Sequence, residues 1–281
     1  MRLDNRRLSG NVDDRRGLSG KGKAGLGIGG LVIAALLTWV LGGNPLDVIT
    51  NSGADMLTSG QQQQHTFTAE EQELAEFSSK VLAGTEDVWK KIFNQSGMTY
   101  REPKMVLFTN SVNTACGGAT SAVGPFYCSA DETVYIDLSF FMSMKQQLGA
   151  GGDFAYAYVI AHEVGHHVQH LLGTLDKAHA EMSRMNQVDA NKVSVALELQ
   201  ADFYAGIWGY YDNQMFNSLE EGDLEEATNC AGKIGDDYLQ KKAGGHAVPD
   251  SFTHGTSQQR TQWLSLGLNT GDVERGFELI R

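Results

Sequence analysis

The stretch AYVIAHEVGHHVQHLLG, residues 157–173, places four histidines and one glutamate in an otherwise apolar run. Asp153 can cap a helix that begins just before this run, and Gly173 can end it. The pattern therefore predicts a helix from Phe154 to about Leu172. Ionisable side chains on an apolar, buried helix seldom lack a chemical role, so we expect the functional chemistry on this helix.

Two of these histidines form the zinc-binding half of an H-E-x-x-H motif. His162 and His166 are four residues apart, so on a helix their rings share one face and both can reach one ion at about 2 Å. Glu163 lies about 100° further round the helix, beside the open position of the ion rather than among its ligands. We expect Glu163 to act as a general base toward water at one Zn²⁺ ion. The alternative is a helix that carries hydrogen-bonded core histidines.

The other two histidines of the stretch are predicted to lie outside the metal site. Three histidines at i, i+4 and i+8 span roughly 12 Å of helix axis, which is too far for one tetrahedral ion, so His170 is not a third ligand. The extended metzincin motif is absent, because Gln169 and Leu172 stand where its glycine and its last histidine belong. We assign His167 and His170 to packing or to support of the site.

A catalytic zinc site needs a third protein ligand and one open position. The downstream candidates are His179, Glu181, Asp189, Glu198 and Asp202. The apolar stretch VALELQADFYAGIWGYY, residues 195–211, predicts a helix that carries Glu198 and Asp202 one turn apart. We expect Glu198 to be the third ligand, and Asp202 to accept a hydrogen bond from the outer ring nitrogen of a liganding histidine. An exposed acidic helix face is the alternative.

The rest of the chain predicts a helix-rich α+β domain with a small sheet. Thr68 and Glu71 form a capping-box pattern where the folded domain is expected to begin. Strands are predicted at 104–110 (KMVLFTN) and 133–141 (TVYIDLSFF), and further helices at about 175–186, 189–211 and 223–241. In the second strand Tyr135, Asp137 and Ser139 alternate with apolar residues. If this strand forms an edge near the zinc, we expect these three residues to hold an extended peptide substrate.

The N-terminal part of the chain predicts a membrane anchor. No charge occurs between Lys23 and Asp47, and residues 24–43 supply the roughly 20 residues that cross a bilayer as a helix. The chain would then consist of a basic cytoplasmic tail (1–23), a transmembrane helix (24–43), a flexible linker (44–67) and a metallopeptidase domain (68–281). A cleaved signal peptide is the alternative.

Charge is unevenly distributed along the chain. The first 23 residues contain seven basic and three acidic residues, a net charge of +4, so the remainder carries −16 of the total of −12. The positive-inside rule then predicts a single-pass membrane protein, with its N-terminus in the cytoplasm and its domain on the outer side of the membrane. The bilayer is expected to be contacted through residues 24–43. Such an acidic domain is a poor partner for a polyanion, so no nucleic acid is expected to bind.

The sequence contains three cysteines. Cys116 and Cys128 enclose a Gly-rich loop of a length that a disulfide can close, and an exported domain permits that bond. A metal-binding role is the alternative, although neither has a neighbouring cysteine or histidine at ligand spacing. Cys230 is expected to be a small, buried apolar residue.

Several segments together resemble a known family. HEVGH followed by ELQAD resembles the gluzincin pattern H-E-x-x-H…E-x-x-x-D, and ACGGATSAVGPFYC, VYIDLSFF and FTHGTSQQR extend the likeness. Over nearly its whole length the chain resembles the bacterial putative neutral zinc metallopeptidase family. The resemblance implies a zincin-like domain with His162, His166 and Glu198 as ligands of one Zn²⁺ and Glu163 as catalytic base.

The tail segment THGTSQQR resembles the H-x5-R element of related gluzincins, which implies that His254 and Arg260 lie near the substrate carbonyl. Of the two, we expect Arg260 to support the site from outside the ligand set. The bacterial family also implies that the membrane is the bacterial inner membrane and that the domain lies in the periplasm or outside the cell. A structural role at the start of a helix is the alternative for this pair. The predicted function is peptide-bond hydrolysis by a membrane-anchored zinc endopeptidase that acts on a peptide or protein, with His254 stabilising the oxyanion. Two other functions stay open: a zinc hydrolase of a non-peptide cell-wall amide, and a non-enzymatic envelope scaffold that binds zinc for stability.

Overall fold

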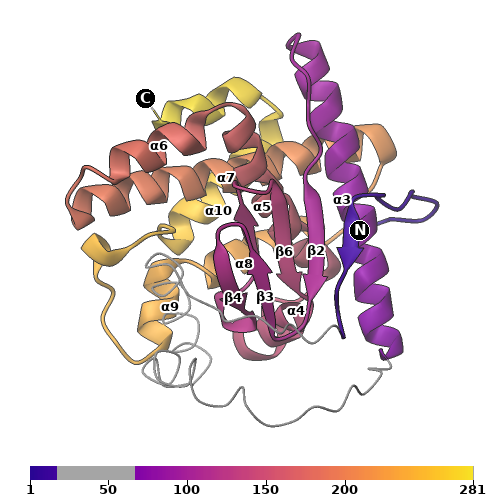
Figure 1. Cartoon of the computed structure of the whole chain (residues 1–281), viewed down its shortest axis with the longest axis horizontal. Helices are drawn as coiled ribbons and strands as arrows, with labels where there is room; N and C mark the ends of the chain where they lie inside the picture. Colours follow the sequence, from indigo (N-terminus) through magenta and orange to yellow (C-terminus); the bar gives the residue numbers. More distant parts are fainter. Residues whose placement is uncertain (18–66, 281) are drawn as a thin grey trace.

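The protein is described here by a computed structural model that covers residues 1–17 and 67–280 (Figure 1). Its main sheet has four strands in the order β1-β2-β6-β5, namely β1 (Val12–Asp14), β2 (Lys104–Phe108), β6 (Thr133–Asp137) and β5 (Phe126–Cys128). A separate hairpin pairs β3 (Ser111–Thr114) with β4 (Gly117–Thr120). The principal helices are α3 (Ala69–Gln95), α4 (Ser139–Ser143), α5 (Asp153–Leu171), α6 (Thr174–Met182), α7 (Gln187–Phe216), α8 (Asp223–Lys233), α9 (Asp236–Lys242) and α10 (Ser257–Thr270). The predicted helix-rich α+β architecture is confirmed.

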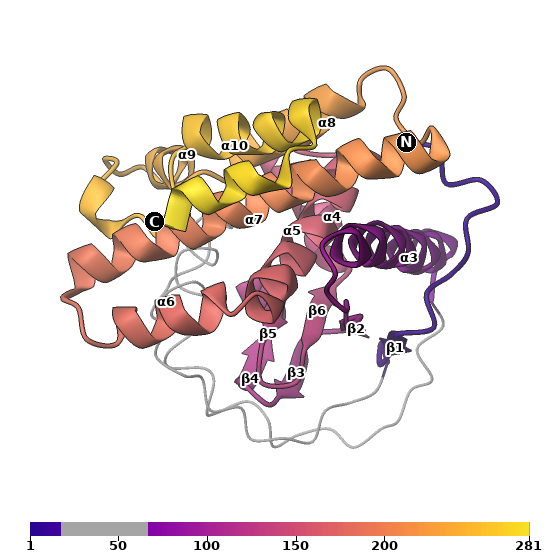
Figure 2. The same cartoon turned by 90° about the horizontal axis from the view of Figure 1, so that it is seen from above.

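The helix α5 lies at the centre of the domain. Figure 2 shows the sheet on one side of α5, α7 crossing its other side, and α10 lying beyond α7. The core joins all these layers: Leu107 and Ile136 from the sheet pack in one cluster with Ile160 from α5, Phe203 from α7 and Leu264 from α10. Because α5 is covered on both faces, its sequence is apolar almost all the way round.

Glycines set how closely α7 approaches its two neighbours. A Cβ on Gly206 would lie 2.3 Å from the Leu264 carbonyl oxygen, and a Cβ on Gly267 would lie 2.3 Å from the Phe203 carbonyl oxygen. The backbones of α7 and α10 are therefore in direct contact at these two positions. On the other side, a Cβ on Gly165 of α5 would lie 3.0 Å from the Ala201 carbonyl oxygen.

Two predicted elements end earlier than expected. The strand predicted over 133–141 stops at Asp137, whose carboxylate accepts a hydrogen bond from the Ser139 backbone N–H at 3.0 Å, and α4 follows. The helix predicted over 223–241 is divided into α8 and α9. At the break, Gly235 lies so close to Ser257 that a Cβ would be 2.3 Å from the Ser257 nitrogen, so the chain turns where α10 begins.

The predicted substrate strand is wrong. Residues Tyr135 and Asp137 belong to β6, which is hydrogen-bonded to β2 on one side and to β5 on the other, and both residues are buried. Ser139 is already part of α4. The edge strand on this side of the sheet is the short β5, which has only three residues between Pro125 and Ser129 and gives little sequence signal.

The expected boundary between tail and domain does not hold for the first seventeen residues. Residues 1–17, which we call the N-terminal segment, were expected within a separate tail, but β1 pairs in parallel with β2. The Arg6 guanidinium also forms an ion pair with Asp212 of α7 at 2.7 Å. Figure 2 shows this segment running past α3 along the side of the domain. Its arginines therefore act as partners of an acidic domain.

The predicted transmembrane helix (24–43) and almost all of the predicted linker (44–67) lie outside the described residues. Within residues 1–17 and 67–280, no helix combines the length and the apolar character that crossing a bilayer requires. The predicted capping box is confirmed, because Thr68 and Glu71 form both of its hydrogen bonds at the beginning of α3.

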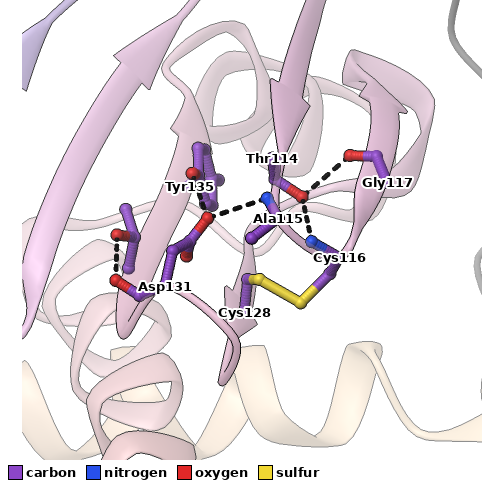
Figure 3. The surroundings of a disulfide bond; sticks show 8 residues. Thr114, Ala115, Cys116, Gly117, Cys128, Asp131 and Tyr135 are labelled. Carbon is purple, nitrogen blue, oxygen red and sulfur yellow. Dashed lines mark hydrogen bonds between the residues drawn. A yellow bond between two sulfur atoms is a disulfide. The ribbon is translucent and has the colours of Figure 1, made fainter.

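The predicted disulfide between Cys116 and Cys128 is confirmed (Figure 3). It joins the turn between β3 and β4 to the end of β5, so the hairpin is fixed to the edge strand. The Asp131 carboxylate, which follows β5, accepts a hydrogen bond from the Ala115 backbone N–H at 3.0 Å and reinforces the same junction. Cys230 is a free thiol and is fully buried, as predicted.

Candidate metal centre

Helices α5 and α7 bring together the three predicted zinc ligands. The Nε2 atom of His162 lies 3.1 Å from one carboxylate oxygen of Glu198, and the Nε2 atom of His166 lies 3.5 Å from the other. Two donors that are each about 2 Å from a tetrahedral zinc are about 3.4 Å apart. The three side chains therefore fit one Zn²⁺ ion, with two imidazole nitrogens and a carboxylate oxygen as donors.

The close approach at Gly165 explains why Glu198 reaches the histidines. With no side chain at Gly165, the backbone of Ala201 packs directly on α5. Glu198 precedes Ala201 by about one turn and so projects toward the face of α5 that carries His162 and His166. The glycine inside HEVGH thus positions the ligand that comes from the second helix.

Asp202 fixes the orientation of the His162 ring. The Nδ1–H group of His162 donates to one oxygen of Asp202 at 2.8 Å, which directs the lone pair of Nε2 toward the metal position. The same carboxylate is fully buried, accepts the Tyr158 hydroxyl at 2.5 Å and binds the Arg260 guanidinium through contacts of 2.8 and 2.9 Å. Burial alone would raise the pKa of Asp202, but Arg260 and His162 lower it to about 2.

Gln169 plays the corresponding part for His166 and was not predicted. Its side-chain oxygen accepts a hydrogen bond from Nδ1 of His166 at 2.9 Å. Its amide nitrogen donates to the Leu197 carbonyl at 2.7 Å and to the Gln200 side chain at 3.0 Å, which fixes the amide orientation. The available signal was a polar residue three positions after His166 on a helix that is otherwise apolar.

Glu163 lies next to the three donors without joining them. It is largely buried, with an exposed fraction of 8%, and burial raises the pKa of its carboxyl group above the ordinary value. A raised pKa brings a carboxylate closer to the pH at which it exchanges protons efficiently. In Glu198, by contrast, the imidazoles of His166, His254 and His162 overcome the effect of burial and hold the pKa well below its usual value. The two glutamates are therefore suited to different tasks.

His254 reaches the site from the loop before α10, and Asp236 holds it in place. One oxygen of Asp236 accepts the backbone N–H groups of Thr253, His254 and Gly255 at 2.8, 2.7 and 3.0 Å. The other oxygen lies 3.2 Å from Nδ1 of His254. Burial lowers the pKa of His254, but Glu198 and Asp236 together raise it above 6.5. Asp236 was missed because the predicted helix placed it in the middle of a continuous helical surface.

The sequence profile described as putative neutral zinc metallopeptidase matches residues 1–276 of this chain. The chain belongs to this family. One relative, from Escherichia coli K12, is named "Uncharacterized protein YpfJ" and is 48% identical over 279 residues, which are 97% of this chain and 96% of the relative. Another, from Mycobacterium tuberculosis H37Rv, is named "Uncharacterized protein Rv2575" and is 41% identical over 195 residues, 66% of this chain and 64% of the relative. No solved structure matches the chain.

Arg260, the second residue of the H-x5-R element, lines the cleft and contacts the polar groups around His162. Arg260 is almost fully buried, and its guanidinium contacts Asp202 and the Tyr158 hydroxyl. It supports the carboxylate that orients His162. His254 is thus the member of the pair that faces the metal donors.

The remaining histidines of α5 lie away from the donors, in keeping with the sequence prediction. His167 is fully buried, with Nδ1 2.8 Å from the Tyr127 hydroxyl and Nε2 2.7 Å from the Arg101 carbonyl. Burial lowers its pKa to about 4, so the ring is neutral. His170 lies 3.3 Å from Asp176 on the outer side of the helix.

The candidate metal donors line a cleft of about 600 Å³. Helix α5 contributes Tyr158, Val159, His162, Glu163 and His166 to its wall. Apolar side chains from other elements also line the cleft, among them Phe140, Leu148, Leu175, Met182, Leu197, Ile234 and Leu239. Phe126 and Tyr127 of the edge strand β5 form part of the wall.

Proposed function

We propose that this protein is a zinc-dependent endopeptidase. The observation that carries the proposal is the convergence of His162, His166 and Glu198 beside a buried Glu163, all lining one cleft. Membership of a zinc metallopeptidase family supports zinc as the metal and hydrolysis as the reaction. Many residues besides the donors line the cleft, which gives room for an extended peptide and suits cleavage of a bond inside a chain.

The roles of the protein groups follow from their positions. Zinc, when bound, acidifies a water molecule and polarises the carbonyl of the bond to be cleaved. Glu163 accepts the proton of the attacking water and then delivers it to the leaving amine nitrogen. His254, whose pKa is raised by Glu198 and Asp236, donates a hydrogen bond from its protonated ring to the developing oxyanion. Asp202 and Gln169 keep the two ligand imidazoles in the required tautomer.

The edge strand and the cleft walls indicate the substrate. β5 is paired with β6 along one side, and Phe126 and Tyr127 of β5 line the cleft. An extended peptide can add to the other side of β5 through backbone hydrogen bonds. The apolar walls favour large apolar side chains on either side of the cleaved bond. We therefore propose an extended peptide or unfolded protein segment as substrate, in preference to a polar cell-wall amide.

The decisive variant is Glu163→Gln, tested in the full-length protein loaded with zinc. We expect it to keep one zinc per chain, measured by elemental analysis, and to lose about 10²- to 10⁴-fold in kcat on a peptide library. Glu198→Gln is the matched comparison, because it should lose zinc as well as cleavage. If Glu163→Gln cleaves as well as the parent, the peptidase proposal fails and a zinc-stabilised scaffold becomes the better explanation.

The compartment is also a proposal. A disulfide such as Cys116–Cys128 persists in oxidising surroundings and is rare in the cytosol. We place the catalytic domain in the periplasm or outside the cell on this ground. A thiol-trapping assay on freshly lysed cells is the test, since a fully reduced pair would contradict it.

A further inference from the structure

The N-terminal segment supplies partners for charges that the domain buries. The guanidinium of Arg6 donates to both oxygens of Asp212 at 2.7 and 3.2 Å. The side chains of Arg6 and Asp212 are only 9% and 1% exposed. Arg6 also lies over the ring of Phe216 at 3.7 Å. Removal of one partner from a buried ion pair of this kind strongly destabilises a fold, because the other charge stays buried without compensation.

A second buried acid of the domain depends on the same segment. Glu86 of α3 is 1% exposed. Its carboxylate accepts hydrogen bonds from the Ser9 hydroxyl at 2.5 Å and the Asn11 amide at 2.9 Å, and it lies 2.8 Å from the Arg7 guanidinium. These partners all come from the N-terminal segment, so Glu86 would lose them together if the segment were elsewhere.

Backbone pairing joins the segment to the sheet. In the parallel pairing of β1 with β2, Val12 is opposite Met105, and Asp14 is opposite Leu107. The Met105 N–H donates to the Asn11 carbonyl at 2.9 Å. Without the segment, β2 would become an exposed strand edge.

The end of the N-terminal segment lies against the start of α3. Arg16 is 7% exposed, its guanidinium lies 4.3 Å from the ring of Phe67, and it donates to the Glu71 carbonyl at 2.7 Å. The last part of the N-terminal segment and the start of α3 are thus in direct contact.

We propose that the N-terminal segment and the catalytic domain occupy the same side of the membrane. A single crossing by residues 24–43 would separate them by a hydrocarbon layer of about 30 Å, which the contacts of Arg6, Arg16 and β1 do not allow. The sequence 44–66 contains no second apolar stretch of about 20 residues. Arg6 and Arg7, two of the arginines that suggest a cytoplasmic N-terminus, instead pair with Asp212 and Glu86 of the domain. The inference is independent of the peptidase proposal.

Labelling of single cysteines in the full-length protein tests the proposal. Leu8→Cys and Val248→Cys introduce thiols at positions that are 54% and 53% exposed, one in the segment and one in the domain. The native cysteines stay silent, because two form a disulfide and Cys230 is buried. A membrane-impermeant maleimide is applied to intact spheroplasts and then to permeabilised ones. We expect both thiols to react in the same step, whereas reaction in opposite steps would overturn the proposal.

A charge-matched pair of variants tests the docking itself. Arg6→Gln and Arg15→Gln each remove one positive charge before residue 24, but Arg15 pairs with Asp13 inside the segment and is 42% exposed. We expect Arg6→Gln to lower the Tm of the full-length protein clearly and Arg15→Gln to leave it nearly unchanged. The charge swap Arg6→Asp with Asp212→Arg should recover part of the loss. Equal Tm values for Arg6→Gln and Arg15→Gln would show that the segment is undocked, and the proposal would fail.

Discussion

Both candidate ligand imidazoles are oriented by a buried polar side chain that lies outside the set of three donors. Asp202 does this for His162, and Gln169 does it for His166. Each of these side chains is itself fixed by further hydrogen bonds, to Arg260 and Tyr158 in one case and to Leu197 and Gln200 in the other, as described above. The site is therefore preorganised for a divalent ion at the level of single side chains.

Replacement of Gln169 should weaken zinc binding. Gln169→Met keeps the volume but removes the acceptor for His166 Nδ1, so we expect zinc affinity to fall about 10- to 100-fold in a competitive chelator titration. His170→Gln is the control, since His170 lies on the same helix and contacts none of the donors. Loss of zinc in the control would contradict the assignment of His170 as a residue outside the site.

The Asp236–His254 contact should set the alkaline side of the pH profile. Glu198 and Asp236 raise the pKa of His254 above its ordinary value against the effect of burial, so the protonated ring is lost at a higher pH than in a free imidazole. Asp236→Asn removes this support, and the alkaline limb of kcat/KM should move to lower pH. Asp237→Asn is the matched control, because Asp237 bonds to Ser257 and not to His254. Identical profiles for parent and Asp236→Asn would exclude His254 as the proton-bearing group.

At the scale of elements, the geometry of the site depends on close contact between helices. Gly165 allows α7 to approach α5, and the pair Gly206 and Gly267 allows α10 to lie against α7. The first contact places Glu198, and the second places Arg260 beside Asp202. The positions of Glu198 and Arg260 thus depend on the glycines at the helix crossings as well as on the charged residues of the site.

Gly206→Ala should be destabilising although alanine favours helices. The new Cβ would lie 2.3 Å from the Leu264 carbonyl, and overpacking of this kind costs about 1–3 kcal/mol. Gly232→Ala in α8 meets nothing closer than 3.6 Å and should instead be neutral or gain about 1 kcal/mol. Urea denaturation of both variants measures the difference. Equal midpoints would mean that α10 is not packed on α7 as described.

The elements that the sequence predicted well are those with local signals. The end of α5 follows from Gly173, whereas the predicted cap Asp153 is the first residue of the helix and makes no capping hydrogen bond. The two candidate ligand histidines follow from spacing on one helix. The strand order depends on contacts between distant segments, and β5 is too short to show a pattern, so the edge strand was misassigned. Asp236 was missed because the helix break at Gly235 is caused by contact with α10 rather than by local sequence.

At the scale of the molecule, the uneven charge of the chain has a structural meaning. From sequence alone, the basic N-terminus predicts the orientation of the chain in a membrane. Ion pairs between residues more than 200 positions apart cannot be recognised from the local sequence. In the structure Arg6 and Asp212 are neighbours, as are Arg7 and Glu86. The N-terminal segment is therefore part of the folded domain.

Protein production is affected directly by this arrangement. A truncated protein that starts at residue 66 is the natural choice for avoiding the apolar stretch. It would lack Arg6 and Arg7, which are the cationic partners of Asp212 and Glu86. We expect such a truncated protein to express poorly and to melt well below the full-length protein in a thermal shift assay. Since Arg16 and Phe67 are in contact, a short glycine-serine bridge in place of residues 18–66 would retain both halves in one polypeptide. That abridged version should melt near the full-length protein and offers a practical route to crystals.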